Sequence, residues 1–159
     1  MNVRNCMKQN VVSLHPSATI GEAARLFVQH HVGTLPVVDD DRRLIGILHL
    51  RDLIQLVMPA FTKLLEDFDF VLKDFGEYEE SRPSPEVVTQ PVVEVMEEAV
   101  WVKVHSGLLR AFALLDEHDL YDLPVVDEDE RLVGLASRVD IGTALMAPWQ
   151  DNVGASDDE

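Results

Sequence analysis

A short apolar motif that occurs twice constrains the fold of this chain more than any other feature. The run Leu-Pro-Val-Val-Asp stands at 35–39 and again at 123–127, so the two copies lie 88 positions apart. A fixed internal offset is typical of a chain built from two copies of one supersecondary unit. Two further pairs keep the same offset: Leu-Ile-Gly at 44–46 with Leu-Val-Gly at 132–134, and Asp52 with Asp140.

Each copy carries the pattern of the same five elements, in the order β-α-β-β-α. Ser17 or Thr19 is expected to cap the first helix and Gly33 to end it. The acidic turn at 39–42 joins two short apolar runs as a hairpin. The predicted fold class is therefore α/β (α+β), with strands at 11–14, 35–38, 44–48, 100–104, 123–126 and 132–136 and helices at 20–31, 51–57, 108–118 and 139–146.

The chain divides into two motifs, an insertion and a tail. We expect the first motif at 1–58, an inserted helix and linker at 59–90, the second motif at 91–147 and a flexible acidic tail at 148–159. Apolar residues in the insertion recur at steps of three and four, which predicts an amphipathic helix. Its stripe packs either on the protein's own core or in an interface with a second copy or a partner. The stripe consists of Phe61, Leu64, Leu65, Phe68, Leu72 and Phe75.

The excess of acidic residues limits the partners of this protein. The chain has 29 Asp and Glu against 13 Lys and Arg, a formal net charge of −16. Such a surface repels nucleic acids and anionic membranes, so neither is an expected partner. No apolar run approaches the roughly 20 residues of a membrane-spanning helix. With a single cysteine, Cys6, the composition fits a reducing compartment, and we expect a cytoplasmic protein.

These features together resemble the cystathionine β-synthase (CBS) domain, which occurs in tandem pairs called Bateman modules. The resemblance rests on the doubled Leu-Pro-Val-Val-Asp run, on Gly-h-h-x-x-x-Asp (h, hydrophobic) at 46–52 and 134–140, on the Glu22-Ala23 helix entry, and on Val-x-x-x-Met openings. It covers about 3–58 and 92–146. It implies two motifs packed through their sheets with pseudo-twofold symmetry, two clefts between them, and a homodimer.

The resemblance implies a main ligand site at the second motif. Relatives that bind adenosine-containing ligands use Gly-h-h-Ser/Thr-x-x-Asp, in which the Asp accepts from the ribose hydroxyls and the hydroxyl residue donates toward phosphate. Helix capping by the same two side chains is the alternative. Arg138 could add a charge near a phosphate, and Tyr121 could stack on a base. The site predicted from the resemblance comprises Ser137, Arg138, Asp140, Val100, Tyr121, Asp122, Leu123 and Pro124.

A second site is predicted at the first motif, where the match is incomplete. His49 stands in place of the hydroxyl residue, and its imidazole either fills the phosphate space or binds phosphate when protonated. The carboxylate of Asp122 and the net charge favour a monophosphate or S-adenosylmethionine over ATP. The residues assigned to this second site are Asp52, His49, Val12, Thr34, Leu35 and Pro36.

The function indicated by these patterns is regulatory and not enzymatic. We expect a module that binds AMP, ADP, ATP or S-adenosylmethionine and signals to its own dimer or to an effector protein in trans. The alternative is a ligand-free scaffold that serves oligomerisation or assembly. The sequence contains no nucleophile–base pairing and no spacing typical of metal ligands, so we expect no catalytic residues, no catalytic cofactor and no metal.

Overall fold

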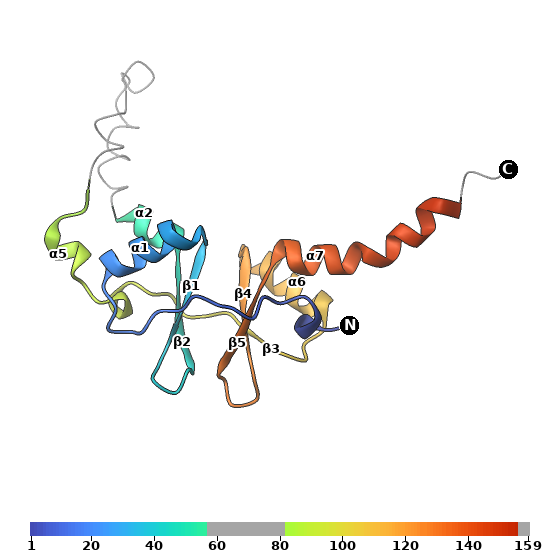
Figure 1. The fold of residues 1–159 in the computed structure, drawn as a ribbon, viewed down its shortest axis with the longest axis horizontal. Helices are drawn as coiled ribbons and strands as arrows, with labels where there is room; N and C mark the ends of the chain where they lie inside the picture. Colours follow the sequence, from blue (N-terminus) through green and yellow to red (C-terminus); the bar gives the residue numbers. More distant parts are fainter. Residues whose placement is uncertain (57–81, 156–159) are drawn as a thin grey trace, which may run out of the picture.

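The protein consists of two similar α/β units whose hairpins stand side by side (Figure 1). The structure is a computed structural model, and it describes residues 1–56 and 82–155. A two-stranded sheet, β1–β2, belongs to the first unit, and a three-stranded sheet, β3–β4–β5, belongs to the second. The elements in chain order are η1 (Val3–Asn5), α1 (Ile20–His30), β1 (Thr34–Val38), β2 (Leu44–His49), α2 (Leu50–Gln55), α5 (Pro85–Val88), η3 (Val92–Glu94), β3 (Val102–Lys103), α6 (Leu108–Glu117), β4 (Asp122–Val126), β5 (Leu132–Ser137), α7 (Arg138–Met146) and η4 (Ala147–Ala155).

The hairpins and helices confirm the predicted order of elements in both copies. Val37 pairs with Gly46 in the first antiparallel hairpin, and Val125 pairs with Gly134 in the second. Thr19 caps α1, since its Oγ1 accepts the amide of Glu22 at 3.1 Å and a Glu22 carboxylate oxygen accepts the amide of Thr19.

The prediction that Gly33 ends α1 was wrong, and the helix predicted over 20–31 ends one residue earlier, at His30. His31 has a left-handed backbone with a φ of 51°, and its amide bonds to the carbonyl of Phe27 at 3.0 Å. This geometry at His31 ends the helix before Gly33 is reached.

The first strand of each copy is shorter than predicted because proline interrupts the ladder. Leu14 forms only an isolated parallel bridge with Val37, and β3 spans only two residues beside β4. A longer pairing toward the N-terminus would need amides from Pro36 and Pro124, which have none. Toward the C-terminus, the amide of Val104 donates to the carbonyl of Val126 at 2.9 Å. The equivalent residue in the first copy is Pro16, which has no amide hydrogen to donate. The prediction of strands at 11–14 and 100–104 was therefore too long.

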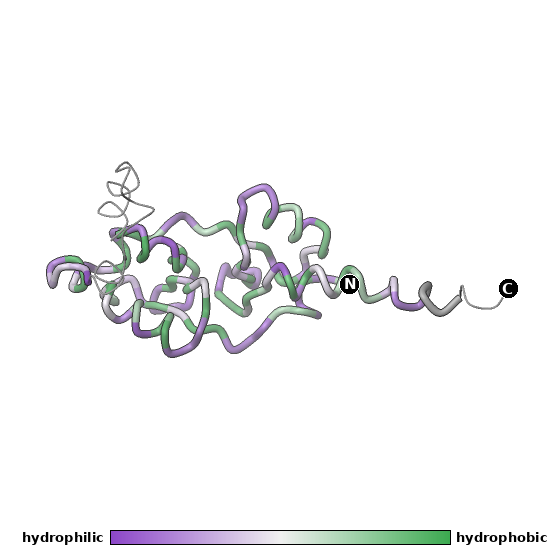
Figure 2. The backbone as a smooth tube through the Cα atoms, turned by 90° about the horizontal axis from the view of Figure 1, so that it is seen from above, coloured by the Kyte–Doolittle hydropathy of each residue, from purple (hydrophilic) through white to green (hydrophobic). Residues whose placement is uncertain are grey.

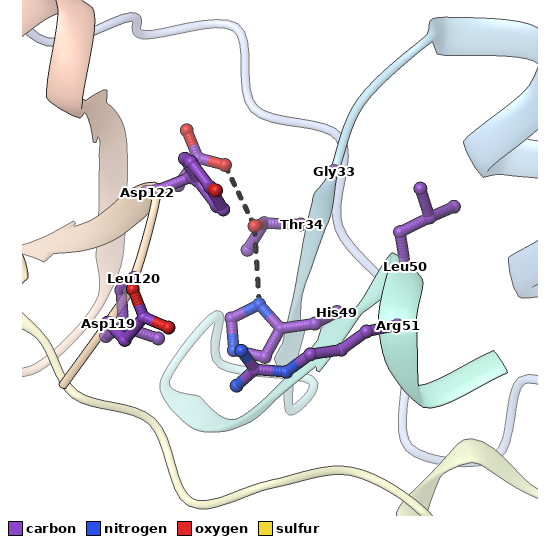
Figure 3. Close-up of a pocket in the computed structure, with 9 residues that line it drawn as sticks. Gly33, Thr34, His49, Leu50, Arg51, Asp119, Leu120 and Asp122 are labelled. Atoms are coloured by element: carbon purple, nitrogen blue, oxygen red, sulfur yellow. Dashed lines mark hydrogen bonds between the residues drawn. The ribbon is translucent and has the colours of Figure 1, made fainter. Parts of the chain in front are cut away.

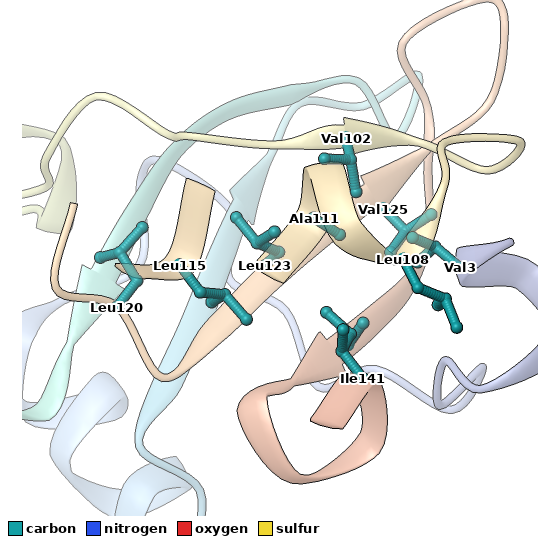
Figure 4. Close-up of a cluster of buried hydrophobic side chains, with 10 residues drawn as sticks. Val3, Val102, Leu108, Ala111, Leu115, Leu120, Leu123, Val125 and Ile141 are labelled. Atoms are coloured by element: carbon teal, nitrogen blue, oxygen red, sulfur yellow. The ribbon is translucent and has the colours of Figure 1, made fainter. Parts of the chain in front are cut away.

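Each unit has its own hydrophobic core, but the segment that leads into each unit packs in the other core. Val3, near the N-terminus, is fully buried among residues of the second unit (Figure 4). Val92 is fully buried among residues of the first unit. The chain therefore crosses between the units twice, and the boundaries predicted at 58 and 91 do not follow the two cores.

The crossing segments meet the two hairpins in the same way. The amides of Lys8 and Leu135 each donate to the other residue's carbonyl at 2.9 Å, and Glu97 and Ile47 exchange the same pair of bonds. Leu135 and Ile47 are 88 positions apart, while Glu97 and Lys8 are 89 apart. The two halves are thus related by the predicted pseudo-twofold symmetry, with a one-residue difference in the lead-in segments.

Two predicted segments lie partly or wholly outside the residues that the structure describes. The apolar stripe at 61–75 is outside them, so its packing stays a prediction. After α7 the chain continues as η4, which projects from the body (Figures 1 and 2). The flexibility predicted for 148–159 stays a prediction. Within 1–56 and 82–155, no helix is long and apolar enough to cross a membrane.

Candidate ligand-binding clefts

The largest cavity between the two units is lined by residues from both of them. Its volume is about 410 Å³, and a neighbouring cavity of about 170 Å³ shares His49, Arg51 and Leu120 with it. We call the two together the large cleft, and Figure 3 shows the residues that line its larger cavity. Its lining consists of Gly33, Thr34, Ile47, His49, Leu50, Arg51, Glu97, Glu98, Val100, His118, Asp119, Leu120, Tyr121 and Asp122.

A second cavity lies on the other side of the contact between the hairpins. Its volume is about 210 Å³, and we call it the small cleft. Gly33, Thr34 and Asp122 line both clefts, so these three residues form a shared wall. The lining of the small cleft consists of Lys8, Asn10, Val11, Val12, His31, Val32, Gly33, Thr34, Asp122 and Leu135.

A hydrogen bond between repeat-equivalent residues joins the two units at this wall. Thr34 Oγ1 donates to Asp122 Oδ2 at 2.9 Å, and the two positions are 88 apart. Thr34 Oγ1 also lies 3.5 Å from His49 Nδ1 (Figure 3). Thr34 and His49 are both buried. The first unit thus presents a hydroxyl where the second presents a carboxylate, so the two clefts are not chemically equal.

Burial favours the neutral form of the His49 ring by lowering its pKa. Desolvation lowers its pKa below the ordinary value, and Arg51 acts in the same direction, while Glu97 and Asp122 oppose the shift. His49 Nε2 and Arg51 Nη2 each lie 3.6 Å from Glu97 Oε2. Of the two alternatives for His49, binding phosphate as a cation is therefore the one that its surroundings disfavour.

Asp52 follows His49 at the start of α2 and has an unusual environment. Its Oδ2 accepts the amide of His49 at 2.7 Å. Burial raises the pKa of Asp52 to about 6, and the carboxylate of Glu97 adds to the shift, against the lowering effect of the His49 amide bond and of Arg51. Glu97 Oε2 is itself buried and has no hydrogen-bond partner among the residues that the structure describes. A proton or a ligand donor would stabilise this carboxylate pair.

The predicted ribose and phosphate pair of the second motif is engaged in capping α7. Ser137 Oγ accepts the amide of Asp140 at 3.0 Å, and Asp140 Oδ2 accepts the amide of Ser137 at 3.0 Å. Neither residue lines the two clefts. The geometry is therefore that of the capping alternative, and contact of these side chains with a ligand stays a prediction.

Arg138 does not reach toward a phosphate in either cleft. Its Nη2 donates to the carbonyl of Leu115 at 2.9 Å, its Nε donates to the carbonyl of Leu120, and its guanidinium lies 5.7 Å from the centre of the Tyr121 ring. The carbonyls at the C-terminal end of a helix attract cations, which explains this position beyond α6. A contact of Arg138 with a phosphate therefore stays a prediction.

The structure groups the predicted site residues differently from the sequence interpretation. Val100 and Tyr121 line the large cleft with His49 of the first motif, whereas Val12 lines the small cleft with Leu135 of the second motif, and Thr34 and Asp122 line both clefts. The reason is that the units face each other, so each cleft combines a strand end from one unit with the loop before a strand of the other. Four predicted residues are buried in β1 and β4 and line neither cleft: Leu35, Pro36, Leu123 and Pro124.

Five charged cleft residues were missed by sequence reasoning: Lys8, Arg51, Glu97, Glu98 and Asp119. Arg51 lies inside the 46–52 segment and could have been singled out there. Lys8 and Glu97 each follow the Met of a Val-x-x-x-Met opening, and that shared position was the available signal. Within 1–56 and 82–155, no group of three or more His, Cys, Asp or Glu side chains could hold a metal ion.

Comparisons with known proteins agree with the repeat and with the fold. The family model of the CBS domain matches residues 3–59 and 87–147. MJ1225 of Methanocaldococcus jannaschii is 27% identical over 150 residues, and the CBS domain-containing protein CBSX2, chloroplastic, of Arabidopsis thaliana is 30% identical over 146. These matches cover 94% and 87% of this chain, which spans about half the length of the two relatives, 45% and 60%.

A solved structure of CBSX2 in complex with AMP has the same fold. It superposes with a TM-score of 0.70 at 26% sequence identity, covering 93% of this chain and 98% of that one. With two matched motifs and two structural units of the same kind, the chain belongs to the CBS domain family, as a tandem pair.

Proposed function

We propose that this protein is a regulatory module that binds an adenosine-containing ligand between its two CBS motifs. The observation that carries the proposal is the large cleft, whose 410 Å³ cavity is lined by residues of both units. Small-molecule sites have about 300–1,000 Å³, so one nucleoside-sized ligand fits. The AMP in the structure of CBSX2 supports the choice of ligand class.

A ligand in this cleft would act on the contact between the units. Thr34 of the first unit and Asp122 of the second belong to the shared wall and are hydrogen-bonded to each other. A ligand that contacts both units shifts their relative arrangement by the difference between its affinities for the two arrangements. This shift is the signal that we propose is passed on.

The candidate ligands are AMP, ADP, ATP and S-adenosylmethionine. Asp119 and Asp122 line the cleft, and their carboxylates disfavour a polyphosphate. We therefore expect a monophosphate or S-adenosylmethionine to bind more tightly than ATP. The ligand has no catalytic role in this proposal, and the protein acts as a sensor and not as an enzyme.

We also propose that the module works as a homodimer, or through an effector protein in trans. Two large apolar side chains, Val28 of α1 and Ile54 of α2, are exposed beside the same surface cavity, and they support an interface there.

Thermal unfolding of the full chain with each of the four ligands tests the proposal. We expect at least one ligand to raise Tm, because a ligand at 100 times its Kd stabilises the folded state by about 2.7 kcal/mol. A blocking variant sharpens the test. Gly33 lines both clefts, and a Cβ there meets nothing within 4 Å, so the side chain of Gly33→Phe would grow into the ligand space. This variant should lose the shift, and the control Gly33→Ala should keep it.

The same samples decide between the sensor and its alternative. A ligand-free scaffold is favoured by one observation, the engagement of Ser137 and Asp140 in capping α7. No shift with any of the four ligands would reject the sensor in favour of the scaffold. Light scattering on these samples is expected to give twice the chain mass of 17.9 kDa, and a monomer at all concentrations would reject the dimer.

A further inference from the structure

One equivalent position carries opposite charges in the two clefts. Glu97 pairs through its backbone with Ile47, and Lys8 pairs in the same way with Leu135, the repeat equivalent of Ile47. Glu97 lines the large cleft and Lys8 lines the small one. The pseudo-twofold symmetry therefore places a carboxylate in one cleft where it places an ammonium group in the other.

The remaining charges make the large cleft strongly acidic. Besides Glu97, three further carboxylates line it, and Arg51 is its one Arg or Lys. Arg51 lies 3.6 Å from Glu97, so part of its charge is already compensated. These further carboxylates belong to Glu98, Asp119 and Asp122.

Glu97 also has an unused acceptor in the large cleft. Its Oε2 atom is buried without a hydrogen-bond donor among the described residues, although 42% of the Glu97 side chain is exposed. The groups beside it are the ring of His49 and the guanidinium of Arg51, each at 3.6 Å, and the carboxyl group of Asp52. A cationic or hydrogen-bond-donating ligand group would be stabilised at this carboxylate pair. An anionic group would meet repulsion from the same oxygen.

The small cleft has a different balance of charge. Lys8 brings one ammonium group, and Asp122 is the one Asp or Glu that lines it. Asp122 Oδ2 already accepts the hydroxyl of Thr34. Lys8 forms no ion pair within 1–56 and 82–155, so its charge is available to an anion. On a protein of net charge −16, this cleft is the place where a phosphate meets the least repulsion.

We propose that the two clefts sort adenosyl ligands by the charge at the 5′ position, with Glu97 and Lys8 as the specificity-determining residues. The large cleft takes a cationic group such as the sulfonium of S-adenosylmethionine. The small cleft, which at about 210 Å³ is below the usual volume of a small-molecule site, takes the single phosphate of AMP, while part of the nucleoside stays outside it. This assignment rests on the proposed function, and it adds that both ligand classes bind one chain at the same time.

Calorimetric titration of the full chain with two matched ligand pairs tests the assignment. S-adenosylmethionine is compared with the uncharged thioether 5′-methylthioadenosine, and AMP with uncharged adenosine. Glu97→Gln should weaken S-adenosylmethionine about tenfold and change the thioether less than twofold, because one charge interaction near a protein surface has about this size. Lys8→Gln should weaken AMP about tenfold and change adenosine less than twofold.

Each variant serves as the control of the other, since Glu97→Gln should leave AMP unchanged and Lys8→Gln should leave S-adenosylmethionine unchanged. Thermal unfolding without ligand checks that both variants fold. Charge sorting is overturned if the charged and uncharged members of a pair weaken equally, or if S-adenosylmethionine and AMP compete for one site. If none of the four ligands binds the unmodified chain, the proposed function itself is overturned, and this assignment with it.

Discussion

At the scale of single residues, equivalent positions have acquired different chemistry. Asp52 and Asp140 are each the third residue of a helix. The carboxylate of each accepts the amide of the residue that precedes its helix, His49 or Ser137. Glu97 lies beside Asp52 and adds to the rise of its pKa, and the equivalent of Glu97 in the other half is Lys8. A sequence motif therefore does not define the protonation state of its own aspartate.

The raised pKa of Asp52 predicts a specific dependence of stability on pH. A folded-state pKa of about 6, against an ordinary 3.8, means that the folded protein binds this proton more tightly than the unfolded chain. The contribution is complete below pH 4 and is lost as the pH rises through 6. We expect Asp52→Asn, which cannot ionise, to gain stability relative to the unmodified protein between pH 4.5 and 7.

Urea unfolding of both proteins at several pH values measures this difference. Asp140→Asn replaces the same capping carboxylate in the other motif and controls for the exchange of Asp for Asn. A stability difference between Asp52→Asn and the unmodified protein that does not vary with pH would contradict the raised pKa.

At the scale of elements, the lead-in segments cross the hairpins at two glycines. A Cβ on Gly134 would collide with the Met7 sulfur and lie 3.0 Å from the carbonyl of Lys8, and a Cβ on Gly46 would collide with the sulfur of Met96. Both glycines lack a positive φ, so space and not backbone strain explains them. The close approach lets Lys8 and Glu97 pair with the strand edges, and it thereby forms the clefts.

Gly134→Ala should therefore destabilise the fold by about 1–3 kcal/mol, the range for overpacking a filled site. Urea unfolding measures the loss. Gly33→Ala is the control, because a Cβ at Gly33 meets nothing within 4 Å, and it should be neutral or slightly stabilising. Adding Met7→Ala to Gly134→Ala should recover part of the loss. Equal effects of the two glycine variants would show that the crossing is not close.

At the scale of the whole molecule, exchange of the lead-in segments ties the two units together. Val3 donates its amide to Ser106 at 2.9 Å and buries its side chain in the second core, while Val92 donates to Ala18 at 2.7 Å and is buried in the first. Each core therefore includes a residue from the lead-in segment of the other motif: Val3 in the second core and Val92 in the first. A ligand that moves one unit against the other must therefore also act on these crossings.

Hydrogen exchange on two matched variants tests the exchanged segments. Val3→Ala should cost roughly 2 kcal/mol and lower amide protection mainly in 102–141, because the removed methyl groups leave a cavity in the second core. Val92→Ala should lower protection mainly in 14–48, the region of the first core. If both variants lower amide protection in the same region, the assignment of Val3 to the second core and of Val92 to the first is contradicted.

Much of the fold could be predicted from the sequence, and less of the site. The offset of 88 and the period of the apolar residues predicted both hairpins and four helices, since these depend on local patterns. The length of the first strands was missed, although Pro36, Pro124 and Pro16 were visible, because the partner strand of a parallel ladder is not known in advance. A minority of the cleft residues were named, and these were grouped by motif: Val12, Thr34, His49, Val100, Tyr121 and Asp122.

The sequence by itself determined that this protein has two similar α/β units, because the repeat and the hydrophobic periodicity act through neighbouring residues. The resemblance of their motifs to the CBS domain gave the family. Only the tertiary structure decided which residues share a cleft. Lys8 is 127 positions from Leu135, with which it pairs, and Glu97 is 50 positions from Ile47. The crossing of the chain brings each residue to its partner strand. Long-range packing, not the motif, thus places a positive charge in one cleft and a negative charge in the other.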